Sequence, residues 1–488
     1  MSDRRAPQAG DPTRLNFLAT VKAFRSAPLD LFARIADLPD GVATVRVPGV
    51  TIVFVTHPDH VHRVLKENHQ NYDKNALIYN NARPFLGDGL PVAHGGENWR
   101  RRRRMVQPAF HRTNVPLVAD VTVRYLAEAV DEWDREADRG QPVDVALLLA
   151  QLTMRIACRA LFDVDVAEAE SIAKRFGEIS EFAVDFLTRQ FPPLFVPTRG
   201  NRRFHANMRQ VNAFVDDVVR SRQAGRQRQG DLLDLLIDAV ADPSGDLSAT
   251  QLRSELISMF FAGHDTLAQT LAWAVYLVAG HPDVDRRLHD EVASVLDGRP
   301  ATAADLPNMP YVSAVVREAM RLYPVSWTMM RRAIGPDVIG GYPIRPGTLV
   351  TWSPYAGNRD PEIWADPTAF HPERFLPEQS AGRCRHAVLP FGAGPRVCIG
   401  TDFAMAEAGL ILATLVQCFS VELVADRPVK PAAGITLHPE GGLWGTLRRR
   451  PSADKRKDSS DELSAGAVGD ERRPVHDAAE NAAQHHSR

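Results

Sequence analysis

Cys398 lies in a loop whose composition suits a thiolate. The stretch FGAGPRVCIG, residues 391–400, surrounds it with three glycines and a proline. These glycines let backbone N–H groups approach the sulfur closely, where a side chain would block them. Residues 401–419 have a helical pattern, and a helix N-terminus beside the sulfur favours negative charge. With Phe391 as a shield and Arg396 as an anion-binding group nearby, the loop is suited to a stabilised thiolate, the form in which cysteine binds a metal.

Two other interpretations of this cysteine are open from the residues alone. A lone cysteine in a glycine turn is often simply buried as a small apolar group. Alternatively, Cys384, His386 and Cys398 would together offer ligands to zinc. Their spacing matches no usual zinc pattern, a fourth ligand is not obvious, and the glycines would have no purpose.

The stretch AGHDT, residues 262–266, lies within the longest helical pattern and combines a glycine with an acid and an alcohol. A glycine inside a helix costs about 1 kcal/mol relative to alanine, which makes sense if the helix passes close to a flat cofactor. Thr266 can turn its hydroxyl onto the carbonyl of Ala262 and open a groove. Asp265 supplies an acid beside it, so the pair is a candidate proton relay. The alternative is a helix in which Gly263 serves packing, Thr266 is buried and Asp265 faces water.

Five consecutive arginines, residues 100–104, follow Trp99. Such a run can bind nucleic acid, but a formal net charge of −2 gives the chain no overall attraction to it. On a helix, Trp99 and Arg103 share one face and the other arginines point outward. We therefore expect no nucleic-acid partner.

Glu318 and Arg321 stand at i and i+3 on one helical face. Such pairs are common on surfaces and usually contribute little. The stretch FHPERF, residues 370–375, places Arg374 between two phenylalanines that would bury it.

In their order along the chain, these motifs resemble those of the cytochrome P-450 monooxygenases. The pattern Phe-x-x-Gly-x-Arg-x-Cys-x-Gly, matched at Phe391, Gly394, Arg396, Cys398 and Gly400, resembles the haem-binding loop of that family. The resemblance implies that the cofactor is haem b and that Cys398 is the axial thiolate ligand of its iron. A thiolate in that position favours cleavage of the O–O bond.

The same resemblance implies roles for the other motifs. Residues 262–266 resemble the oxygen-activation motif, with Ala262 and Gly263 beside the haem and Asp265 and Thr266 as catalytic residues. Glu318, Arg321 and Arg374 resemble a triad that fixes geometry and does no chemistry. Trp99 and Arg103 resemble a pair that binds one haem propionate. Arg331 or Arg332 is expected to meet the second propionate, and we favour Arg331.

The implied activity is insertion of one oxygen atom from O₂ into a C–H or C=C bond, for example as a hydroxylation. The 38 residues after position 450 are too few for a flavin or ferredoxin module. Electrons from NAD(P)H are therefore expected through separate partners, a ferredoxin or flavodoxin with its reductase, and the outward arginines would meet an acidic donor. The alternatives are a peroxygenase driven by H₂O₂, which would not need Asp265 and Thr266, and a haem-binding sensor without catalysis.

The expected substrate pocket is largely apolar, which indicates a hydrophobic guest such as a terpene, a fatty acid or a polyketide-like molecule. Its candidate residues are Ile78, Phe182, Phe261, Val325, Trp327 and Leu443.

Helical patterns dominate the chain, and short strand patterns rich in Val, Ile and Thr stand between glycines and prolines. The longest helix is expected over residues 248–279, with a capping box at Ser248 and Gln251 and a left-handed exit at Gly280. The fold class is mainly α with small β-sheets, and the resemblance implies a single triangular domain over residues 16–450. Residues 1–15 are expected to be flexible, and residues 451–488 form a polar tail without aromatic residues that is expected to be disordered.

Composition and termini indicate the cytoplasm. Hydrophobic residues make up 44% and charged residues 24%, as in soluble enzymes. The four cysteines show no close pairing, which favours a reducing compartment. Residues 1–24 lack the apolar core of a signal peptide, and no stretch approaches the roughly 20 apolar residues of a membrane anchor.

Overall fold

The longest helix forms as the sequence predicts. In the computed structural model, α11 spans Ala249–Ala279, and the Ser248 side chain accepts the N–H of Gln251 while the Gln251 side chain accepts the N–H of Ser248. This is the predicted capping box. The left-handed exit predicted at Gly280 is wrong, because that residue keeps a right-handed conformation with φ −83°. The helix ends instead because Pro282 occupies the first turn of the next helix.

The structure describes residues 13–38, 41–47, 49–163, 172, 174–180, 182–183, 186, 193–224, 232–241, 248–384 and 386–451. The predicted tail therefore lies outside the described residues, except for Pro451, and so does most of the predicted N-terminal segment. Just before residue 16, the expected start of the domain, Thr13 and Arg14 form strand β1 and pair in parallel with Ala43 and Thr44.

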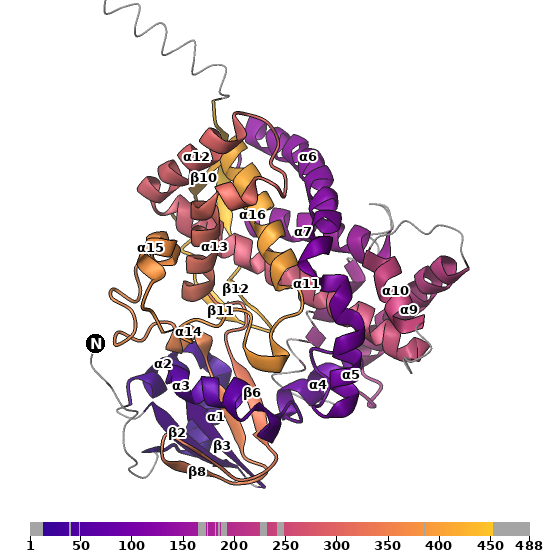
Figure 1. The fold of residues 1–488 in the computed structure, drawn as a ribbon, viewed down its shortest axis with the longest axis vertical. Helices are drawn as coiled ribbons and strands as arrows, with labels where there is room; N and C mark the ends of the chain where they lie inside the picture. Colours follow the sequence, from indigo (N-terminus) through magenta and orange to yellow (C-terminus); the bar gives the residue numbers. More distant parts are fainter. Residues whose placement is uncertain are drawn as a thin grey trace, which may run out of the picture.

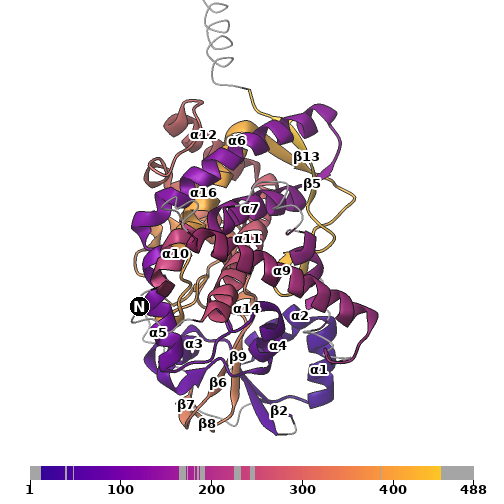
Figure 2. The same ribbon diagram turned by 90° about the vertical axis from the view of Figure 1, so that its right-hand side faces the viewer.

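Helices dominate the described part of the chain, as predicted, and they surround α11 (Figures 1 and 2). The other α-helices are α1 Phe17–Ser26, α2 Pro28–Ala36, α3 Pro58–His62, α4 Leu77–Leu86, α5 Glu97–Val106, α6 Val115–Arg139, α7 Val145–Phe162, α9 Arg199–Gln223, α10 Leu232–Ala241, α12 Pro282–Leu296, α13 Pro310–Leu322, α14 Pro354–Gly357, α15 Pro377–Ser380 and α16 Thr401–Cys418. Shorter helical turns are Arg63–Glu67, His69–Asn71, Gln107–Phe110, Arg112–Asn114, Leu306–Asn308, Pro372–Phe375 and Gly394–Arg396.

The strands form small sheets, the largest of which lies at the lower left of Figure 1 with α1, α2 and α3. Their bounds are β1 Thr13–Arg14, β2 Val42–Val47, β3 Val50–Val55, β4 Tyr72–Asp73, β5 Val143–Asp144, β6 Met329–Ala333, β7 Asp337–Ile339, β8 Tyr342–Ile344, β9 Leu349–Trp352, β10 Phe419–Leu423, β11 Pro431–Ala433, β12 Leu437–Pro439 and β13 Trp444–Arg449. The largest sheet has the order β1-β2-β3-β9-β6-β4, and its only parallel pairs are β1 with β2 and β3 with β9 among the described strands. The other sheets have the orders β10-β13-β5, β11-β12 and β7-β8.

The core surrounds α11, which contacts α7, α13 and α16. Figure 2 shows α7 and α11 side by side in the helix-rich part of the molecule. Two of the described helices, α7 and α16, are long and apolar enough to cross a membrane, yet 56% of each 18-residue stretch is buried inside the protein. Their apolar faces thus form much of the core around α11.

Candidate active site

The loop before α16 has a conformation that depends on glycine. The N–H of Cys398 donates to the carbonyl of Phe391 at 2.8 Å, which closes the loop. Gly394 has φ +68°, and a Cβ at this position would come within 2.0 Å of the Leu65 carbonyl oxygen. Gly392 also has a positive φ, of +74°. Only glycine fits at position 394 without moving the backbone of the Arg63–Glu67 turn.

Cys398 is exposed at its residue surface, and protein atoms still surround the thiol closely enough to affect its pKa. Burial raises the pKa of the Cys398 thiol, and the N–H of Gly400 and the charge of Arg103 act in the opposite direction. A thiol next to such donors becomes a stable thiolate when a metal cation binds it. The loop can therefore hold a metal through this sulfur.

The middle of α11 opens onto space. Ala262 and Gly263 are exposed although most of this helix is buried, and a Cβ added to Gly263 would meet no atom within 4 Å. The Thr266 hydroxyl donates to the Ala262 carbonyl, as predicted. Gly263 therefore serves no helix packing here, which removes the alternative interpretation of this stretch. The surface is suited to a flat group lying against the helix.

Asp265 is half-buried and is held by two neutral donors. Its Oδ2 accepts the hydroxyl of Thr436 at 2.8 Å, and its Oδ1 accepts the side-chain amide of Gln269 at 3.3 Å. The neighbouring His264 is buried and its Nδ1 lies 3.0 Å from the Phe260 carbonyl oxygen. The acid and alcohol predicted from the sequence thus stand on consecutive positions beside the open face of the helix.

A group of cations lies near the cysteine loop, since the charge of Cys398 acts on the pKa of both Lys74 and Arg103. Lys74 donates to the Pro91 carbonyl at 2.6 Å, and burial followed by the charges of Arg331 and Arg396 lowers the pKa of Lys74. Burial and the charge of Arg331 lower the pKa of Arg396 to about 9. Burial also lowers the pKa of Arg103. Within the described residues, none of these four cations has a carboxylate within 4 Å, so the group is suited to an added anion.

Two buried donors in this group have no acceptor among the described residues. The guanidinium carbon of Arg396 lies 4.0 Å from the ring centre of Trp99, and its Nη1 donates to the Ala93 carbonyl at 2.9 Å. Arg396 Nη2 and Trp99 Nε1 are left without a partner. Because buried donors are normally satisfied, these atoms fit the carboxylates of a bound group such as the haem propionates.

The choice between Arg331 and Arg332 follows from strand β6. Arg331 is 5% exposed and donates to the Tyr79 hydroxyl at 2.8 Å, whereas Arg332 is exposed to solvent. Alternation along the strand sends the two side chains to opposite faces. Only Arg331 therefore belongs to the buried cation group.

One arginine of the run on α5 does not point outward as predicted. Arg100 and Arg104 are exposed, as expected, but Arg102 is 1% exposed. Arg102 donates to the Asp88 carbonyl at 2.5 Å and lies 3.2 Å from the Glu255 carboxylate. The prediction that all arginines other than Arg103 point outward is wrong, because a buried acid of α11 attracts Arg102.

The predicted triad is formed. Arg321 donates to both carboxylate oxygens of Glu318 at 2.7 Å, and Arg374 Nε lies 3.4 Å from Glu318 Oε1. Arg321 also donates to the carbonyls of Asn358, Pro367 and Ala369. These bonds tie α13 to the segment that leads into the cysteine loop, and a structural role explains them without any chemistry.

The predicted substrate pocket divides into two sets. Ile78 and Phe261 are half-buried, and Phe182 stacks on Phe204 with ring centres 5.0 Å apart. Trp327 is 6% exposed and packs against Phe32, and its place in the pocket stays a prediction. Leu443 is completely buried in the core and offers no surface to a guest here.

Val325 is 7% exposed and uses its carbonyl to accept the N–H of Leu437.

Lys74, Tyr79 and Thr436 were not predicted as site residues. Tyr79 follows Ile78 of the expected pocket, but no motif or spacing in the sequence marks the three residues themselves. Only the buried position of Lys74 next to Arg331, and the contact of Thr436 with Asp265, identify them.

Other candidate sites do not compete with this one. The His386 ring stacks on His62 with centres 3.5 Å apart, and the described residues form no cluster of three or more metal-binding side chains that would suit zinc.

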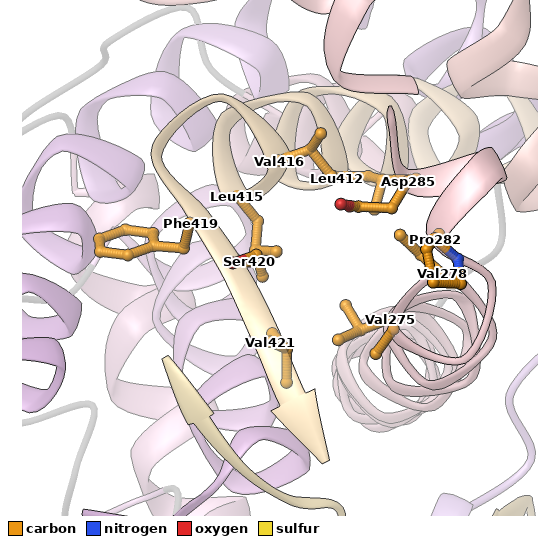
Figure 3. A pocket seen from close by; sticks show the side chains of 11 residues that line it. Val275, Val278, Pro282, Asp285, Leu412, Leu415, Val416, Phe419, Ser420 and Val421 are labelled. Atoms are coloured by element: carbon orange, nitrogen blue, oxygen red, sulfur yellow. The ribbon is translucent and has the colours of Figure 1, made fainter. Parts of the chain in front are cut away.

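A cavity of about 100 Å³ lies between α11, α12, α16 and β10, next to Asp285 (Figure 3). Its lining includes no residue of the cysteine loop or of residues 262–266, so it does not serve this chemistry.

Comparison with known proteins agrees with this geometry. The sequence model of the family described as Cytochrome P450 matches residues 9–445. Cyclooctat-9-en-7-ol 5-monooxygenase of Streptomyces melanosporofaciens is 32% identical over 431 residues, which are 87% of this chain and 90% of the relative. Pentalenene oxygenase of Streptomyces avermitilis is 32% identical over 403 residues, 81% of this chain and 87% of the relative. Cytochrome P450 4V2 of Mus musculus is 29% identical over 433 residues, 83% of this chain and 82% of the relative. The chain therefore belongs to the cytochrome P450 family of haem-thiolate monooxygenases, which act on hydrophobic substrates.

Proposed function

We propose that this enzyme oxidises a cyclic terpene in the cytoplasm. The names of two bacterial relatives, cyclooctat-9-en-7-ol 5-monooxygenase and pentalenene oxygenase, point to such molecules. The observation that carries the proposal is the open, apolar face of α11 at Ala262 and Gly263, with Phe261 next to it. A ring system without charge suits this surface, since no ion pair is needed to bind it.

We infer that Cys398 holds the haem iron and that Trp99, Arg103, Lys74, Arg331 and Arg396 bind the propionates. The unpartnered donors of Trp99 and Arg396 and the unpaired cations support this assignment. When bound, haem supplies the iron at which O₂ is reduced. The residues of the chain bind it, exclude water from it and deliver protons.

The proposed reaction takes RH, O₂, two electrons and two protons to ROH and water. Asp265 and Thr266 are proposed to supply the two protons, since both stand beside the open face of α11. A peroxide-driven reaction would bring its protons with the oxidant and would leave this pair without a task. The intact pair therefore supports the O₂-driven reaction.

The proposed electron donor is a ferredoxin or flavodoxin, reduced by NAD(P)H through its reductase. Arg100 and Arg104 on α5 are exposed and share the single carboxylate of Glu97, so together they leave a net positive charge for an acidic donor. Long-range attraction of this kind raises association rates and falls with ionic strength.

The substrate proposal is tested by titrating the purified ferric protein with cyclic terpene hydrocarbons and, in parallel, fatty acids. We expect a cyclic terpene to shift the Soret band to shorter wavelength as it displaces water from the iron. A shift with fatty acids alone, or with no compound of either class, would overturn the terpene assignment.

A further inference from the structure

The turn between β11 and β12 is fixed against α11 by hydrogen bonds from several elements. Trp273 Nε1 on α11 donates to the Leu437 carbonyl at 3.0 Å, and the N–H of Leu437 donates to the Val325 carbonyl at 3.0 Å. Trp327 Nε1 donates to the Gly434 carbonyl at 3.0 Å. Figure 1 shows β11 and β12 next to α11. Thr436, which stands between these anchors, therefore has a well-defined position.

The Thr436 hydroxyl makes the shorter of the two side-chain hydrogen bonds to the Asp265 carboxylate. It donates to Oδ2 at 2.8 Å, and Gln269 donates to Oδ1 at 3.3 Å. Among the described residues, no cation lies within 4 Å of this carboxylate. Neutral donors hold a carboxylate with less energy than an arginine or lysine does, so Asp265 is oriented without being locked.

We propose that Thr436 is a positioning residue for proton delivery during O₂ reduction. This inference rests on the proposed role of Asp265. Thr436 donates its one hydroxyl proton to the Asp265 carboxylate, and the lone pairs of its oxygen remain free to accept a hydrogen bond from water. It thereby keeps the carboxylate beside Thr266 and in reach of solvent protons. Without the hydroxyl, one of the two contacts that orient Asp265 is lost.

Two reactions of the same enzyme differ in their need for delivered protons. The reaction of RH with O₂ consumes two electrons and two protons and yields ROH and H₂O. The reaction of RH with H₂O₂ yields the same products without any added proton or electron. A defect confined to proton delivery slows only the first reaction, whereas a defect in folding or haem binding slows both.

The test compares Thr436→Val, which keeps the shape, with Thr436→Ser, which keeps the hydroxyl. Thr122→Val is the matched control, because Thr122 is buried and its hydroxyl donates only to the Val118 backbone carbonyl at 2.8 Å. O₂ consumption is measured with NADPH, a plant-type ferredoxin and its reductase, in H₂O and in D₂O. Peroxide-driven oxidation of guaiacol is measured on the same samples. In it, H₂O₂ accepts one hydrogen atom from each of two guaiacol molecules and gives two waters and two phenoxyl radicals, so this reaction needs no proton from outside its reactants either.

We expect Thr436→Val to slow O₂ consumption about fivefold, the effect of one ordinary hydrogen bond, and to enlarge the solvent isotope effect. Peroxide-driven guaiacol oxidation should stay within about twofold of the wild type, and Thr436→Ser and Thr122→Val should match the wild type in both assays. In Asp265→Ala the further change Thr436→Val should add nothing, because the two residues act together.

Equal O₂ consumption by Thr436→Val and the wild type would overturn the inference, and so would an equal loss in both assays. If Asp265→Ala slows O₂ consumption in that case, the proposed function still stands. If Asp265→Ala has no effect on O₂ consumption, the proposed proton relay itself fails.

Discussion

Arg396 lies over the ring of Trp99 with 4.0 Å between the guanidinium carbon and the ring centre, and each side chain keeps a buried N–H without an acceptor among the described residues. The two residues are almost three hundred positions apart, on α5 and in the cysteine loop. Their shared lack of acceptors is explained if both donate to carboxylates of the haem. This juxtaposition leads to the first prediction.

Removal of either donor should speed haem loss. A hydrogen bond to a charged group contributes about 1.5–3 kcal/mol, so Trp99→Phe and Arg396→Leu should each raise the rate of haem transfer to apomyoglobin about tenfold or more. Arg104→Leu is the control, since Arg104 is exposed and pairs with Glu97. Unchanged transfer rates in both site variants would remove these residues from the haem site.

The two arginines of β6 should differ sharply. Arg331 is buried and hydrogen-bonded to Tyr79, whereas Arg332 is exposed. Arg331→Leu should therefore weaken haem retention by about tenfold or more, by the same reasoning on charged hydrogen bonds. Arg332→Leu should leave retention unchanged. The opposite ranking in a haem-transfer assay would assign the propionate to Arg332.

Glu255 should make stability depend on pH. Burial raises the pKa of Glu255 to about 7 from its ordinary 4.5. The folded protein thus binds more protons than the unfolded chain between these values, and Glu255 lowers the free energy of unfolding as pH rises from about 4.5 to about 7.

Glu255→Gln removes this proton uptake, and it also leaves Arg102 without the Glu255 carboxylate with which it pairs. Measured by urea unfolding from pH 5 to 8, the stability of the wild type relative to the variant should fall by up to roughly 3 kcal/mol as pH rises. A difference that stays constant over this range, or grows with pH, would show that Glu255 is charged throughout.

Gly394 should be irreplaceable, unlike another glycine of similar backbone conformation. In Gly394→Ala the new methyl group would meet the Leu65 carbonyl oxygen at 2.0 Å, so the loop must move and haem incorporation should fall to a small fraction. Gly298 also has a positive φ, of +84°, but its surroundings are open. Gly298→Ala should cost only about 1 kcal/mol and retain full haem content. Full haem content in Gly394→Ala would show that the loop adapts easily.

The sequence alone predicts those features that depend on local chemistry. The capping box of Ser248 and Gln251, the bond from Thr266 to the Ala262 carbonyl and the pairing of Glu318 with Arg321 all involve residues within four positions of each other. Such interactions are fixed by helix geometry, which the sequence pattern reveals.

Features that depend on distant packing could not be predicted in the same way. Arg102 turns inward because Glu255, about one hundred and fifty positions later, lies opposite it. Leu443 is apolar like the other pocket candidates, but only the packing of the elements buries it completely in the core. Lys74 joins the site through the nearby charge of Arg331, and Thr436 through its hydrogen bond to Asp265, and no sequence spacing reveals either.

The central claim is that the Cys398 sulfur ligates the haem iron, and a carbon monoxide spectrum of the reduced protein tests it most directly. The wild type and Cys384→Ala, which changes an exposed cysteine, should both show the red-shifted Soret band of a thiolate-ligated haem. Cys398→Ser should bind less haem, and its band should lie at shorter wavelength. The same red-shifted band in Cys398→Ser as in the wild type would contradict the claim.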